Sequence, residues 1–145
     1  FVKTHSNSIL LIVGEGPEKE KLELLSQKLN LENSVVFLGY QSKISTYQSL
    51  FDICIFPSEK EPFGLVAVEC LALKKPVLVF QNGGGLAEII SRQNQRNICS
   101  NDTEMLGRLR HYYQNEEQIE VKDELLEYFS VSQMSKAYLE VYDEK

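Results

Sequence analysis

The chain has 145 residues and 43% hydrophobic content, which fits one globular domain with a sizeable core and leaves no room for a second. The formal net charge of -6 and the scattered basic residues argue against a nucleic-acid-binding protein, because neutralising a phosphate backbone requires clustered lysines and arginines. No apolar run reaches the ~18 residues of a membrane span and no signal peptide precedes Phe1, so a soluble protein is expected.

Apolar runs alternate with longer amphipathic stretches over the first hundred residues. The predicted strands are 9–13, 35–38, 53–56, 77–80 and 96–99, and the predicted helices are 18–29, 42–50, 64–73 and 84–90. This alternation indicates parallel βαβ units, so the expected fold class is α/β with a doubly wound parallel sheet. After residue 101 the apolar residues recur at helical spacing, which predicts a helical C-terminal tail.

The segment from Glu61 to Glu69 is the most informative part of the sequence. Pro62 suits the first turn of a helix and Gly64 lets a ligand approach the backbone, so a helix is expected to begin at Phe63 or Gly64. Free N–H groups at a helix start face anions, and carboxylates accept hydrogen bonds from sugar hydroxyls. The segment also follows a short apolar strand, as in α/β ligand sites. The alternative is that both glutamates are ordinary surface charges flanking an amphipathic helix.

Other glycines follow or precede predicted elements. Gly14 and Gly16 lie between a strand and a helix, but Lys19 stands where a dinucleotide fingerprint has its third glycine, which excludes a nicotinamide enzyme. A bare Gly-x-Gly is more often a tight turn. The run Gly83-Gly84-Gly85 precedes a helix and favours close approach by a ligand, with a flexible turn as the alternative.

The cysteines give no sign of a disulfide or metal site. No C-x2-C pair occurs among Cys54, Cys70 and Cys99. Cys54 and Cys70 lie in apolar runs, where a thiol usually packs in the hydrophobic core. A reducing cytoplasm is therefore the expected setting.

Four patches of the sequence resemble the carboxy-terminal, donor-binding domain of the retaining glycosyltransferases of the GT-B fold, family 4, also called glycosyl transferases group 1. They are 10–17, 35–40, 57–69, and 75–79 together with 83–90. They occur in the family's order with family-like spacing and cover roughly residues 9–90, with a weaker match to the end. The resemblance implies a Rossmann-like half of a GT-B fold.

The resemblance also implies roles for particular residues. Glu61 would be the catalytic carboxylate that contacts hydroxyls of the donor sugar, and Glu69 would bind the ribose hydroxyls. Backbone N–H groups of Phe63 and Gly64 would face the sugar or phosphate, with Leu65 counted as donor-binding beside them. The remaining donor-binding positions implied by the family's loops are Gly14, Gly16, Gly39, Tyr40 and Gly84. The nucleotide-diphosphate sugar is the substrate, and neither a cofactor nor a metal is expected.

The sequence departs from the family at its beginning. Residues 1–8 resemble only the tail of the helix and loop that follow the family's first strand, so that strand, its diphosphate-binding Arg and Lys, and the amino-terminal acceptor domain have no counterpart here. We therefore expect residues 1–145 to form a single donor-binding domain that is inactive in isolation and needs an acceptor domain or a partner chain. Its sheet should be open between strands 9–13 and 53–56 unless these two strands close up or another chain fills the gap, so we expect a rearranged sheet, self-association or low stability. Its last helix should carry an apolar face without a full partner.

The sequence thus predicts part of a cytoplasmic glycosyltransferase that transfers a sugar from a nucleotide diphosphate to a saccharide or lipid-linked acceptor, in surface polysaccharide or glycolipid assembly. Peripheral membrane association of the complete enzyme stays open. The main alternative is a non-catalytic nucleotide-sugar-binding subunit or the relic of a truncated gene. A sugar-nucleotide epimerase, and a hydrolase that uses Glu61 and Glu69 as its acid and nucleophile, are weaker alternatives.

Overall fold

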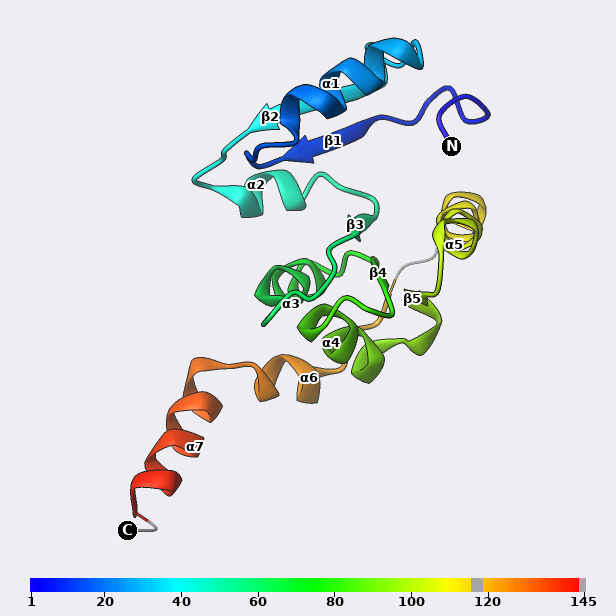
Figure 1. The fold of residues 1–145 in the computed structure, drawn as a ribbon. Coiled ribbons are helices and arrows are strands. Elements are labelled where there is room, and N and C mark those ends of the chain that lie inside the picture. Colours follow the sequence, from blue (N-terminus) through cyan, green and yellow to red (C-terminus); the bar gives the residue numbers. More distant parts are fainter. Residues whose placement is uncertain (116–118, 144–145) are drawn as a thin grey trace. The chain divides into compact units, whose positions relative to one another are not determined.

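The computed structural model describes residues 1–115 and 119–143 of the chain. Within it the chain divides into two compact units, Phe1–Ile44 and Ser45–Lys145, which we call unit 1 and unit 2. Figure 1 shows the order of the helices and strands along the chain.

Unit 1 is a single βαβ arrangement. Strand β1 (Leu10–Val13) and strand β2 (Val35–Gly39) pair in parallel, with an irregularity between Ile12 and Val13, and helix α1 (Lys19–Lys28) connects them. The helix ends where Asn30 adopts a left-handed backbone with φ of 55°. Ser26 is the one buried residue described in this unit, so unit 1 has no buried hydrophobic side chain.

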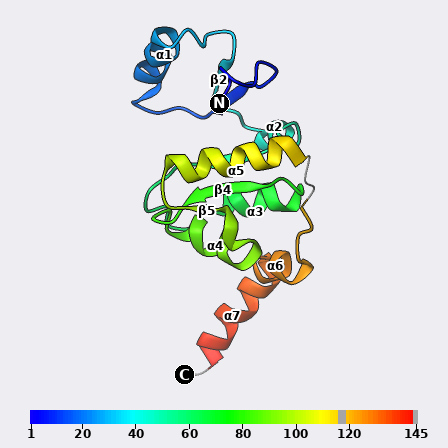
Figure 2. The same cartoon turned by 90° about the vertical axis from the view of Figure 1, so that its right-hand side faces the viewer.

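Unit 2 contains a three-stranded parallel sheet with helices on both faces. Its strand order is β3 (Cys54–Phe56), β4 (Val77–Phe80) and β5 (Ile98–Cys99). Helices α3 (Leu65–Ala72) and α4 (Gly85–Gln93) lie on one side of this sheet, and α5 (Asp102–Asn115) lies on the other (Figure 2). The predicted α/β class with parallel strands is confirmed.

The central strand β4 explains this layering. Successive side chains of a strand point to opposite faces. Val77 and Val79 accordingly pack in the cluster with α3 and α4, whereas Leu78 packs in the cluster with Met105 and Tyr112 of α5. The three β4 residues are all fully buried, as expected for a parallel strand covered on both faces.

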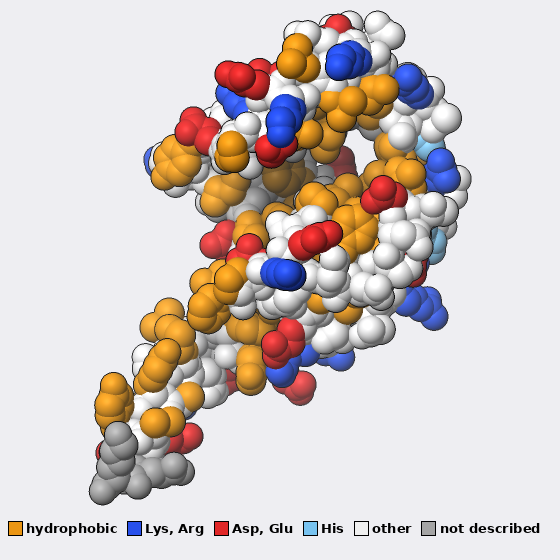
Figure 3. All heavy atoms as spheres, in the orientation of Figure 1, with side chains coloured by type: hydrophobic (Ala, Val, Ile, Leu, Met, Phe, Trp, Pro, Cys, Tyr) orange, Lys and Arg blue, Asp and Glu red, His pale blue; other side chains and the backbone are white. Residues whose placement is uncertain are grey.

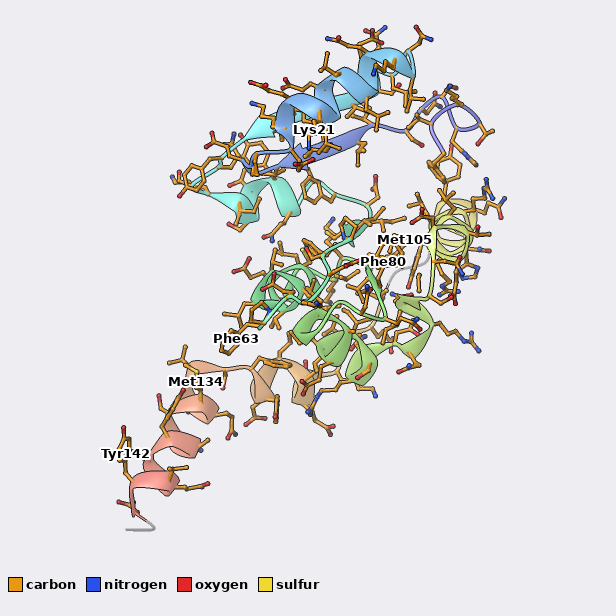
Figure 4. The ribbon with its side chains drawn as sticks, in the orientation of Figure 1. Lys21, Phe63, Phe80, Met105, Met134 and Tyr142 are labelled. Atoms are coloured by element: carbon orange, nitrogen blue, oxygen red, sulfur yellow. The ribbon has the colours of Figure 1, made fainter. Side chains whose placement is uncertain are left out.

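The C-terminal part of unit 2 is helical, as the sequence predicts. Helix α6 (Asp123–Tyr128) docks through buried Leu125, and the Arg92 guanidinium of α4 lies 4.5 Å from the centre of the Tyr128 ring. Helix α7 (Val131–Asp143) follows with no buried residue, and its apolar side chains, Met134 and Tyr142 among them, are exposed (Figures 3 and 4). None of the described helices combines the length and hydrophobicity needed to cross a membrane.

The structure shortens or shifts several predicted elements. Helix α2 covers only Ile44–Gln48 of the predicted 42–50, and strand β5 begins at Ile98 because a 3-10 turn, η1 (Gln95–Asn97), precedes it. In that turn the Asn94 side chain accepts a hydrogen bond from the Arg96 backbone, which starts the 3-10 turn in place of a longer strand.

The described strands form two hydrogen-bonded groups, β1-β2 and β3-β4-β5. Strand β1 therefore has one hydrogen-bonded neighbour among the described strands, and so does β3. Among the described strands, β1 and β3 are therefore edge strands of their groups.

Candidate functional site

The turn between β3 and α3, residues 57–64, is fixed to the turn that precedes α4. The Lys60 backbone N–H donates to the Asn82 carbonyl oxygen at 3.0 Å, and the Gly85 N–H donates to the Glu61 carbonyl oxygen at 2.7 Å. Glu61 and Gly84 also form an isolated parallel bridge. Two turns that lie about twenty residues apart in sequence therefore form one backbone-bonded platform at the carboxyl ends of neighbouring strands.

Glycines make this close contact between the two turns feasible. A Cβ atom on Gly84 would lie 2.5 Å from the Glu61 carbonyl oxygen, and one on Gly85 would lie 2.5 Å from the Phe63 carbonyl oxygen. A Cβ on Gly64 would lie 2.9 Å from the Leu86 backbone nitrogen. At Gly84 and Gly85 the closest neighbour is protein backbone, and at Gly64 backbone and side chain of Leu86 lie equally close, so the glycines let the two turns approach each other. A donor contact at Gly84 stays a prediction.

Helix α3 begins one or two residues later than predicted. Gly64 has a left-handed backbone with φ of 75°, so it stands before the helix, and Leu65 is the first helical residue. The first turn carries no acidic side chain. Within the part of the chain that the structure describes, the backbone N–H groups of Phe63 and Gly64 enter no backbone hydrogen bond. Of these two residues Phe63 is exposed and Gly64 is buried. A helix start of this kind carries unpaired N–H groups and a partial positive charge.

The side chains at this turn leave their polar and apolar groups accessible. Phe63 is 76% exposed and projects from the turn (Figure 4), and Leu65 is 57% exposed. The Glu61 carboxylate takes part in no hydrogen bond or ion pair with another described residue. Glu61 therefore combines an anchored backbone with a carboxylate that is available to a ligand.

Glu69 lies one turn further along α3 and is exposed. Its Oε2 accepts a hydrogen bond of 3.2 Å from the side-chain amide of Gln48, the last residue of α2. Gln48 itself is only 2% exposed. Sequence reasoning missed Gln48, since nothing in its neighbourhood distinguishes a buried glutamine from an exposed one before the fold is known.

Two buried thiols lie behind Glu69. Cys54 of β3 and Cys70 of α3 are free and belong to the same core cluster. A hydrogen bond between them, followed by burial, raises the pKa of Cys70 well above its usual range, and the same bond lowers the pKa of Cys54. The predicted packing role of both cysteines is confirmed. Within residues 1–115 and 119–143, no three His, Cys, Asp or Glu side chains gather closely enough to hold a metal ion.

The other predicted donor-binding residues lie in unit 1. The Gly14 N–H donates to the Gly39 carbonyl oxygen at 2.8 Å, which joins the two strand ends, and Tyr40 is 71% exposed. A cavity of about 310 Å³ opens beside this turn, lined by Gly14, Gly16 and Phe37 among others. A Cβ on Gly14 or Gly16 would meet nothing within 4 Å. The structure thus groups the predicted residues into two sets, one in each unit.

Comparison with known proteins places this chain in a family. The sequence profile of the family described as glycosyl transferases group 1 matches residues 1–128. The N-acetyl-alpha-D-glucosaminyl L-malate synthase of Bacillus anthracis is 34% identical over 98 residues, which cover 68% of this chain and 26% of the relative. The lipopolysaccharide core biosynthesis glycosyltransferase LpsD of Rhizobium meliloti is 28% identical over 98% of this chain and 43% of its own length. The chain spans about a quarter to two-fifths of these relatives.

Solved structures agree on the fold. Anabaena Alr3699/HepE in complex with UDP matches with a TM-score of 0.81 at 22% identity, over 95% of this chain and 41% of that one. Staphylococcus aureus TarM matches with a TM-score of 0.80 at 22% identity, over 97% of this chain and 30% of that one. Both support the GT-B type of α/β fold predicted from the sequence. The chain belongs to the glycosyl transferases group 1 family.

Proposed function

We propose that the chain is the nucleotide-sugar-binding part of a retaining hexosyltransferase, and that the β3–α3 turn holds the donor. The observation that carries this proposal is the pair Glu61 and Glu69 on one strand–turn–helix platform, in a chain that belongs to this family. Residues 1–145 serve as the donor-binding domain, and an acceptor-binding domain or partner chain completes the enzyme.

Glu69 would bind the ribose of the donor. One of its carboxylate oxygens accepts from Gln48, while Oε1 has no partner among the described residues. A carboxylate oxygen with free lone pairs is a strong acceptor for a ribose hydroxyl. Its position beyond the first turn of α3 separates this contact from the helix start.

The helix start would face the phosphates. The free N–H groups of Phe63 and Gly64 and the partial positive charge of the helix N-terminus favour an anion there. Leu65 opens the helix beside them. The N-terminus supplies roughly half a unit of charge, so a diphosphate needs further positive groups from elsewhere in the enzyme.

Glu61 would contact the sugar as the catalytic carboxylate. Its carbonyl oxygen is held by Gly85, whereas its carboxylate is unengaged among the described residues. Gly14, Gly16, Gly39, Tyr40 and Gly84 are the further donor-binding positions of the proposal, and neither a metal nor a cofactor takes part. Three buried, free thiols support a reducing compartment, the cytoplasm, as the site of action.

Calorimetry with nucleotide and nucleotide sugar tests this division of roles. UDP and UDP-glucose are suitable probes, because structures of the Anabaena protein contain them. Glu69→Ala should weaken UDP binding about ten- to a hundred-fold, the value of a charge-assisted hydrogen bond of roughly 1.5–3 kcal/mol. Glu61→Ala should weaken UDP-glucose binding, slow turnover in the complete enzyme and leave UDP binding nearly unchanged.

The matched control is Glu59→Ala, which removes an exposed carboxylate from the same turn. It should change neither affinity. An unchanged UDP dissociation constant in Glu69→Ala would remove Glu69 from the site. Equal losses for UDP and UDP-glucose in Glu61→Ala would contradict its assignment to the sugar.

A further inference from the structure

We infer that Gln48 is a positioning residue, whose buried amide fixes the Glu69 carboxylate in the orientation that receives both ribose hydroxyls and so selects ribonucleotides over deoxyribonucleotides. The inference rests on the proposed function, since it assumes that Glu69 binds the ribose. Beyond that function, Gln48 orients Glu69 and thereby sets the preference for ribonucleotides.

The contact joins a buried donor to an exposed acceptor. Gln48 is 2% exposed, whereas Glu69 lies on the surface of α3, and their Nε2 and Oε2 atoms are 3.2 Å apart. Gln48 belongs to α2 and Glu69 to α3, twenty-one residues later. An exposed glutamate otherwise samples several rotamers, and a hydrogen bond from a fixed, buried group restricts it to one of them.

The amide of Gln48 has one further polar neighbour in the described structure, the buried Cys70 thiol, on which a side-chain hydrogen bond from Gln48 acts against the larger effects that raise the pKa of Cys70. The Oε1 of Gln48 is buried and has no hydrogen-bond partner. An unpaired buried carbonyl costs stability, so an apolar side chain of similar size would fold at least as well here. The Nε2 group faces the carboxylate because turning the amide around would bring two acceptors together. The unpaired Oε1 of Gln48 therefore costs stability, and the contact that its amide makes outside the core is the hydrogen bond that orients Glu69.

Orientation matters most for a ligand with two adjacent hydroxyls. With Oε2 engaged by Gln48, Oε1 and the remaining lone pairs of Glu69 point in fixed directions. A vicinal diol meets such a carboxylate with both hydroxyls, whereas a 2′-deoxyribose offers one. Because the ordering of the carboxylate precedes binding, the ligand loses less affinity to side-chain entropy.

The test compares UDP with 2′-deoxy-UDP in wild type and in Gln48→Met, which keeps the side-chain length and removes the amide. We expect UDP affinity to fall about three- to tenfold, the preference for UDP over 2′-deoxy-UDP to shrink, and the melting temperature to stay or rise. A purely structural glutamine would give the opposite pattern, a lower melting temperature with equal losses for both nucleotides. That pattern, or unchanged affinities, would overturn the inference. Gln48→Leu is the second variant if Gln48→Met misfolds.

A double-mutant cycle with Glu69→Gln separates failure of this inference from failure of the proposed function. If Glu69→Gln leaves UDP binding unchanged, the proposed ribose contact is wrong. If Glu69→Gln weakens UDP binding and Gln48→Met weakens it further by the same factor in both backgrounds, the two residues act independently and the positioning role is wrong. Positioning predicts that Gln48→Met has little effect once Glu69 has been replaced.

Discussion

The glycines at the turn between β1 and α1 differ in their surroundings from those at the two turns before α3 and α4. At the turn between β1 and α1, added Cβ atoms on Gly14 and Gly16 would meet open space. At the turns before α3 and α4, Cβ atoms on Gly64, Gly84 and Gly85 would collide with backbone of the facing turn. The glycines of the β1–α1 turn thus leave room beside the backbone. The glycines before α3 and α4 instead let those two turns form hydrogen bonds with each other.

The two units also differ in how many hydrophobic side chains they bury. Every buried hydrophobic residue described in the chain lies in unit 2, in clusters on both faces of β3-β4-β5. Unit 1 has a strand pair and a helix whose leucines stay largely exposed. Burial of apolar surface is the dominant stabilising contribution to folding, so unit 2 should set the stability of the chain.

Truncating one leucine in each unit, buried in unit 2 and exposed in unit 1, gives the largest predicted difference in stability between the two units. Leu71 is 1% exposed in the core of unit 2, and Leu71→Ala should cost about 2–5 kcal/mol because it leaves a cavity. Leu24 of α1 is 55% exposed, and Leu24→Ala should stay within about 0.5 kcal/mol. Urea denaturation of both variants measures the difference. Similar losses would mean that unit 1 holds a core of its own.

Alanine at glycine positions tests the contrast between the turns. Gly84→Ala should destabilise the chain by about 1–3 kcal/mol, since its Cβ would collide with the Glu61 carbonyl oxygen and its φ of 62° is left-handed. Gly16→Ala is the matched control, because it meets no atom within 4 Å and should be nearly neutral. Melting temperatures of both variants measure the difference. An unchanged melting temperature for Gly84→Ala would contradict the close contact between the two turns.

The smallest predicted difference is a pH-dependent contribution to stability from Glu104 in the first turn of α5, which Glu20 in the first turn of α1 should lack. Hydrogen bonds from the Ser100 N–H and hydroxyl, at 2.8 and 2.7 Å, hold the pKa of the Glu104 carboxyl at α5 below its ordinary value of 4.5. Since the folded pKa is the lower one, this contribution to stability is present above pH 4.5 and is lost as the pH falls through the folded pKa.

Melting temperatures measured from pH 7 down to pH 3 check this effect. Glu104→Gln should melt slightly below wild type at pH 7, and the gap should close as the pH falls. The matched variant Glu20→Gln, in the first turn of α1, should show no comparable gap because no side-chain hydrogen bond to Glu20 is present in the described structure. A gap for Glu104→Gln that stays constant with pH would refute the assigned cause.

The sequence predicts the elements well wherever hydrophobic period and turn residues agree. The run at β4, between Pro76 and the glycines, is apolar throughout and fits a strand buried on both faces. The helix at 42–50 is too long because local polarity does not show where α2 ends. The triple glycine predicts close approach by a ligand, which stays a prediction; the sequence does not show that these glycines also lie against the backbone of a turn about twenty residues away. The role of Gln48 cannot be predicted from the sequence either, because the burial of a polar residue depends on tertiary packing.

The central claim, that the β3–α3 turn holds a nucleotide sugar, can be tested by following amide resonances of the 145-residue chain during titration with UDP-glucose. We expect the backbone amides of Phe63, Gly64 and Leu65 and the side-chain amide of Gln48 to shift together with one dissociation constant. The Glu69→Ala variant should reproduce these shifts only at much higher ligand concentration. Saturable binding of UDP-glucose that leaves these four amide resonances unmoved would show that the β3–α3 turn does not hold the donor.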